Sequence, residues 1–197
     1  MALFSLAGSL FCSAGAVLLN IMPGPIYKLA GLFLAYLGGS VLLLNVCSFQ
    51  MCAALLVCGI GVTVLLGTSL RGNNAAENIH GDSRMDILFR AVLALICGIL
   101  AYAASDSLYS WIPVGKSILF VVLWSSILSL FSLSLDDGLP ARCVYLQTIC
   151  LSFMITYVYM ESSILVFAFF AVINLMLAFG GSVLSMGKPA EEAETES

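Results

Sequence analysis

The sequence predicts an all-α, polytopic integral membrane protein with about seven transmembrane helices. Its residues are 61% hydrophobic and only 9% charged, and the mean hydropathy is +1.10. Soluble domains carry about 25% charged residues. Between Lys28 and Arg71 the chain runs 42 residues without one charged side chain, which is roughly twice the length needed to cross a bilayer core. A water-soluble fold of this composition would expose large apolar patches, so lipid is the expected solvent.

Three spans are expected in the N-terminal part, residues 1–70. Pro23 and Pro25 end the first span, because proline removes a backbone donor and restricts the residue before it. The long uncharged stretch then folds as a helical hairpin, and its turn falls at the polar positions around Ser48. These three spans are expected at residues 2–22, 27–47 and 50–70.

Four further spans are expected in residues 85–187, after a polar loop at 71–84. Ser83 and Asp86 resemble the capping box that opens a helix. Pro140 is well placed to open another helix, because its missing N–H costs nothing in a first turn. The four spans are expected at residues 83–104, 113–135, 141–160 and 164–186. The acidic tail, residues 188–197, is expected to be disordered.

The distribution of basic residues predicts the orientation in the membrane. Seven spans place most basic residues on one side, with Arg90 nearby, and only Lys116 on the other. The residues on the first side are Lys28, Arg71, Arg84, Arg142 and Lys188. Positive residues in short loops stay cytoplasmic. The predicted topology therefore has the N-terminus outside and the C-terminus inside.

Ionisable groups within spans would point to chemistry, because each is costly in lipid unless it is paired or hydrated. Here the charged residues stand near helix ends. Arg90 can pair with Asp86 four positions earlier or reach the headgroups, and Glu161 lies in a turn. The alternative for these residues is a subunit contact or an ion path. No catalytic, cofactor-binding or metal-binding motif is found, so no enzymatic activity of its own, no cofactor and no metal are expected.

Polar residues within spans offer a second set of candidates. Asn45, Gln147 and Asn174 are expected to form hydrogen bonds between helices, or else to line a polar pathway. The seven cysteines are expected to pack as small apolar side chains, with a Cys47–Cys52 disulfide as the alternative. The net charge of −4 comes from the C-terminal glutamates, and without a basic patch no nucleic-acid partner is expected.

The first three predicted spans resemble the small three-helix subunit of respiratory complex I and its relatives in membrane-bound hydrogenases and cation/proton antiporters. The likeness rests on the turn from Asn20 to Pro25, the glycine-containing span from Gly31 to Asn45, and the span from Ala53 to Leu70. Seven spans in 197 residues also resemble component E of the larger formate-linked hydrogenases. The respiratory members carry carboxylates in their second and third helices, whereas Tyr36, Leu37 and the stretch from Cys52 to Ile60 are uncharged here.

The resemblance therefore implies an architectural subunit without the proton-transfer groups, and no functional residue is carried over. We expect a non-catalytic structural subunit of a larger redox- or ion-coupled complex, of the kind found in respiratory chains and proton translocation. Its expected partners are lipids and other integral membrane subunits, in a bacterial or archaeal cytoplasmic membrane. The alternative is a small transporter or channel with a polar lining from Asn45, Gln147 and Asn174. A third hypothesis is a membrane enzyme that acts on lipid or quinone.

Overall fold

Seven α-helices make up the part of the chain that the structure describes, which confirms the predicted all-α membrane fold. The computed structural model describes residues 2–22, 24–73, 84–112, 114–136, 139–161 and 163–186. The helices are α1 (Ala2–Ile21), α2 (Pro25–Leu43), α3 (Phe49–Asn73), α4 (Arg84–Leu108), α5 (Lys116–Leu135), α6 (Leu139–Met160) and α7 (Ile164–Met186). All seven are long and apolar enough to cross a membrane, and each satisfies its backbone within itself, as lipid requires.

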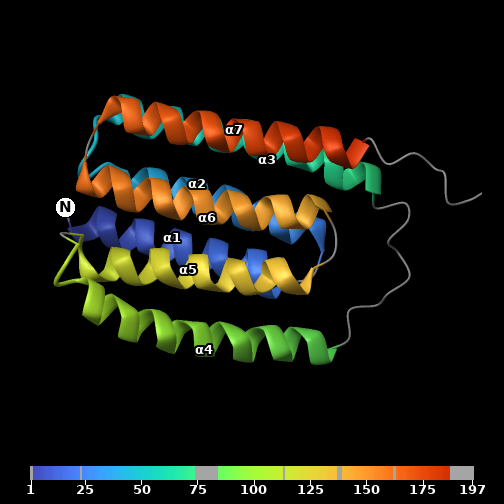
Figure 1. Ribbon diagram of the computed structural model, residues 1–197, viewed down its shortest axis with the longest axis horizontal. Coiled ribbons are helices and arrows are strands. Elements are labelled where there is room, and N and C mark those ends of the chain that lie inside the picture. Colours follow the sequence, from blue (N-terminus) through green and yellow to red (C-terminus); the bar gives the residue numbers. More distant parts are fainter. Residues whose placement is uncertain are drawn as a thin grey trace, which may run out of the picture.

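The helices form two rows that lie against each other (Figure 1). In the N-terminal row, α2 lies between α1 and α3, and in the C-terminal row α6 lies between α5 and α7. Across the rows α1 packs on α5, α2 on α6 and α3 on α7, while α4 lies at one end against α5 and α1. Half of the span residues of α2 and of α6 are buried, against 17% in α4. The core therefore centres on α2 and α6.

Glycines bring α1 and α2 into close contact. A Cβ atom at Gly31 would stand 2.6 Å from the backbone nitrogen of Leu19, and one at Gly38 would stand 2.6 Å from that of Cys12. Such approach of two backbones needs residues without side chains. The turn before α2 depends on a glycine for another reason, because Gly24 has a φ of 102°, which side chains rarely tolerate.

Some helix boundaries differ from those predicted. The second span ends at Leu43 rather than near residue 47, and Asn45 donates from Nδ2 to the Leu42 carbonyl at 3.2 Å. Side-chain bonding of this kind competes with helix continuation. The fourth span runs on to Leu108, and Pro140 is the second residue of α6. Ser83, most of the polar loop at 71–84 and the acidic tail at 188–197 lie outside the described residues.

Candidate functional site: two polar clusters in the bundle

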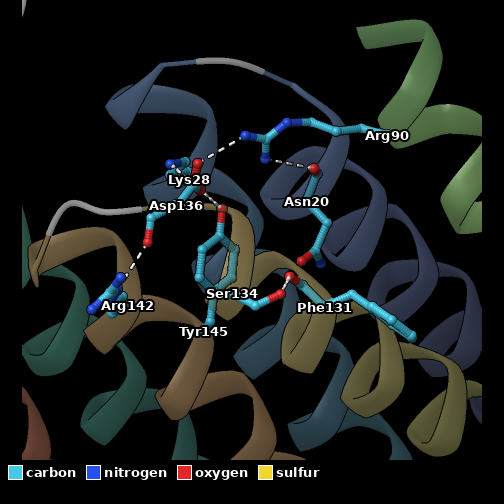
Figure 2. Close-up of polar contacts among 8 residues, drawn as sticks. All are labelled: Asn20, Lys28, Arg90, Phe131, Ser134, Asp136, Arg142 and Tyr145. Carbon is cyan, nitrogen blue, oxygen red and sulfur yellow. Dashed lines mark hydrogen bonds and ion pairs between the residues drawn. The ribbon is translucent and has the colours of Figure 1, made fainter. Parts of the chain in front are cut away.

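The first cluster surrounds Asp136 at the end of α5, on the side predicted to be cytoplasmic. Lys28 in the first turn of α2 donates from Nζ to Oδ2 of Asp136 at 2.8 Å, and Arg90 of α4 donates from Nη2 to Oδ1 at 2.8 Å. The Tyr145 hydroxyl of α6 also donates to Oδ2. Figure 2 shows the three side chains converging on one carboxylate. Four helices are thus joined at one point.

The backbone around Asp136 takes part as well. Arg142 donates from Nε to the Asp136 carbonyl oxygen at 2.9 Å, which holds the turn between α5 and α6. Arg90 also reaches the Asn20 carbonyl oxygen, at the end of α1, from Nη1 at 3.4 Å. Carbonyls at a helix C-terminus carry partial negative charge, so a guanidinium is favourable there. We call Lys28, Arg90, Asp136, Arg142 and Tyr145 the Asp136 cluster.

The carboxylate of Asp136 is held in its charged form. Its side chain is only 15% exposed, and burial alone would raise its pKa. The hydrogen bonds from Arg90 and Lys28, with the positive charge of Lys28, outweigh burial and lower the pKa of Asp136 to about 2. The carboxylate is therefore ionised across the physiological range, and it is the counter-charge of two cations.

The second cluster lies deep in the bundle and joins α2, α6 and α7. The hydroxyl oxygen of Tyr36 lies 3.1 Å from Oε1 of Gln147 and 3.0 Å from Oδ1 of Asn174. All three residues are at most 1% exposed. The Tyr36 ring fits against Gly59 of α3, where a Cβ atom would stand 2.5 Å from ring carbon Cγ. We call Tyr36, Gln147 and Asn174 the Tyr36 cluster.

The Tyr36 cluster uses its hydrogen-bonding groups on itself and on nearby backbone. Gln147 donates from Nε2 to the Asn174 carbonyl at 2.6 Å, and Asn174 donates from Nδ2 to the Phe170 carbonyl at 2.8 Å. One hydroxyl hydrogen serves two amide oxygens. Amides do not titrate near neutral pH, so Gln147 and Asn174 serve here to fix the relative positions of three helices.

A small cavity lies among α1, α2, α5 and α6. Its volume is about 20 Å³, enough for about one water molecule. The Oγ atoms of Ser125 and Ser152, two of the residues that line it, lie 3.0 Å apart, and Cys12 and Ala16 also line it. A space of this size cannot admit a substrate. Among the described residues, no three His, Cys, Asp or Glu side chains are grouped so that they could hold a metal ion.

The structure distributes the predicted candidates among separate places. Gln147 and Asn174 lie together, and Arg90 pairs with Asp136. The side chain of Asp86 lies outside the described residues. Asn45 follows the end of α2, where its Nδ2 donates to the Leu42 carbonyl and its side chain also interacts with Tyr159 of α6. Glu161 is exposed in the turn before α7, where its backbone N–H donates to the Tyr157 carbonyl at 2.8 Å.

Sequence reasoning missed five residues of these clusters, namely Lys28, Tyr36, Asp136, Arg142 and Tyr145. The tyrosines carried a signal, because a hydroxyl within an apolar span needs a partner when it is buried. The sequence around Asp136 gave no such signal, since a carboxylate in a turn with glycine and proline is typical of a solvated loop. No family model, curated protein or solved structure matches the chain.

Proposed function

We propose that this protein is a non-catalytic structural subunit of a larger membrane assembly. The observation that carries the proposal is the closed Tyr36 cluster, in which buried polar groups bond to one another and not to a cavity. Polar residues used in this way stabilise helix contacts. The Asp136 cluster does the same at one end of the bundle, because its charges are paired between helices.

The outer helices support a role in assembly. Only 17% of the span residues of α4 and 22% of those of α7 are buried within the chain. Large apolar side chains cover their outer sides, including Leu95 and Ile99 on α4 and Leu165 and Phe169 on α7, which are all more than half exposed. Such surfaces suit contact with lipid and with other transmembrane helices. We expect other integral membrane subunits as partners.

The kind of assembly is proposed from the resemblance of the first three helices to subunits of complex I, membrane-bound hydrogenases and cation/proton antiporters. Within α2 and the first half of α3 the positions from Leu29 to Ile60 hold no charged residue. A relative without carboxylates there would pack beside an ion-translocating subunit. The proposed setting is a redox- or ion-coupled complex in a bacterial or archaeal cytoplasmic membrane.

Purification in mild detergent tests the proposal. We expect the tagged chain to elute in a large complex, and mass spectrometry to identify other multi-pass polypeptides in a fixed ratio to it. A Gln147→Leu variant serves as the matched control, because a transporter lined by Gln147 would lose solute uptake on this change. The proposal fails if the isolated chain, free of partners, carries a solute into liposomes and the variant does not.

A further inference from the structure

The two rows of helices repeat one layout along the chain. Helices α1 and α5 each have 20 residues. The start of α1 at Ala2 and that of α5 at Lys116 are 114 positions apart, and so are the starts of α2 at Pro25 and α6 at Leu139 (116 − 2 and 139 − 25). The starts of α3 and α7, Phe49 and Ile164, are 115 apart. Each residue of α2 therefore has a counterpart in α6, 114 positions later.

Counterpart helices pack on one another and run in the same direction. The contacts are α1 with α5, α2 with α6 and α3 with α7 (Figure 1). Successive spans alternate in direction, so helices four places apart in the chain are parallel. Helix α4 supplies the extra crossing that lets the second row start on the same side as the first. The chain thus contains a parallel repeat with three helices in each unit.

The contact between α2 and α6 uses different faces of the two counterparts. Gly39 of α2 faces α6, because a Cβ atom there would stand 2.9 Å from Cδ1 of Ile155. Its counterpart in α6 is Phe153, which is 63% exposed. Leu43 is 0% exposed, whereas its counterpart Tyr157 is 44% exposed. The inner face of α2 thus corresponds to the outer face of α6.

The reverse comparison gives the same result. Gln147, Leu151 and Ile155 of α6 are buried and face α2 at Tyr36 and Gly39. Their counterparts on α2 are Phe33, Leu37 and Val41, and all three are only partly buried. A two-fold axis would make both units use one and the same face. The units instead stack head to tail. The outer face of α6 and the outer face of α2 therefore have no partner helix in the other row, and they lie on opposite sides of the molecule.

From this stacking we propose that the outer face of α6 binds the outer face of α2 in a second copy of the chain. The contact would join Leu146, Phe153 and Tyr157 of one copy to Phe33, Leu37 and Val41 of the next. It would place α6 of one copy against α2 of the next in the arrangement that α2 and α6 have within one chain, with different side chains at the contact. Head-to-tail contacts that do not close into a ring extend into a row of molecules. This contact would be one of those that build the proposed assembly, and it rests on the proposed function only in assuming that an assembly exists.

Site-specific photo-crosslinking in native membranes tests this contact. The photoreactive residue p-benzoylphenylalanine replaces Phe153, and irradiation is expected to give a covalent dimer. Peptide mapping should then place the second end of the crosslink on residues 33–41 of the other copy. The matched control carries the same residue at Leu95 of α4, which is 70% exposed on another side of the bundle and should give no such dimer. A Leu37→Trp change in the accepting copy should reduce the Phe153 crosslink several-fold.

Other products would overturn the inference. A crosslink from position 153 to α6 of the second copy would mean a two-fold contact, and a crosslink to another polypeptide or to lipid alone would mean a different neighbour. Co-purification reports separately on the proposed function. If other subunits co-purify but position 153 does not crosslink to α2, the proposed function stands and the contact between copies is refuted. If position 153 crosslinks to α2 but no other subunit co-purifies, the contact stands and the proposed function is refuted.

Discussion

Arg90 Nη2 lies 2.8 Å from Asp136 Oδ1, and this ion pair ties α4 to the end of α5. Helix α4 has few buried residues of its own, so this polar contact adds to a limited packing interface. Trp124 supplies another, because its indole N–H donates to the Ala94 carbonyl at 2.9 Å. The attachment of α4 to the rest of the bundle thus depends on contacts that can be removed one at a time.

Asp136→Asn is expected to destabilise the protein by about 3 kcal/mol, because it leaves Lys28 and Arg90 without their counter-charge in a largely buried place. Thermal unfolding of the purified protein in detergent measures the effect. Asp106→Asn is the control, since the Lys116–Asp106 pair is about half exposed and exposed pairs contribute little. Equal melting temperatures for Asp136→Asn and the unchanged protein would show that the cluster does not stabilise the fold.

The Asp136 cluster should respond to pH only in strong acid. Because the pKa of Asp136 is lowered from 3.8 to about 2 in the folded protein, its stabilising effect is complete above about pH 4 and is lost as the pH falls toward 2. The difference in melting temperature between the unchanged protein and Asp136→Asn should therefore stay constant from pH 7 to pH 5. A difference that shrinks already within that range would contradict the lowered pKa.

Tyr36→Phe removes the hydroxyl that lies between Gln147 and Asn174. We expect a loss of about 1–2 kcal/mol, since two buried amide oxygens lose their shared donor. Tyr109→Phe is the control, because Tyr109 is 55% exposed at the end of the bundle. Unfolding by denaturant in mixed micelles compares the two variants. If both behave as the unchanged protein does, the Tyr36 cluster does not hold the helices together.

Gly31→Ala is expected to cost about 1–3 kcal/mol, because the added methyl group meets the backbone of α1. The Cβ atom would stand 2.6 Å from the Leu19 nitrogen and 2.7 Å from the Gly15 oxygen. Gly61→Ala is the matched control, since no atom outside its own helix backbone lies within 4 Å there. That change should be neutral or stabilising by up to about 1 kcal/mol through helix propensity. Similar losses in both variants would argue against close packing of α1 on α2.

The helices could be predicted more fully than the site. Long apolar stretches between turn residues such as Pro25 and Asp136 mark where the chain must cross, so the number of spans followed from local composition. The end of α2 could not be placed in this way, because the side chain of Asn45 bonds to the backbone. Of the polar residues within spans, Gln147 and Asn174 were identified, but their meeting with Tyr36 depends on the rotation of three helices.

Composition and hydropathy along the chain were enough to predict a lipid-embedded protein with about seven helices, because burial of apolar side chains and of backbone polar groups depends on each segment separately. Which helices are neighbours and which polar atoms meet could be seen only in the folded bundle. Lys28 and Asp136 are 108 positions apart in the chain, and Tyr36 and Asn174 are 138 apart. Contacts at such separations are fixed by packing between helices, which hydropathy along the chain does not encode.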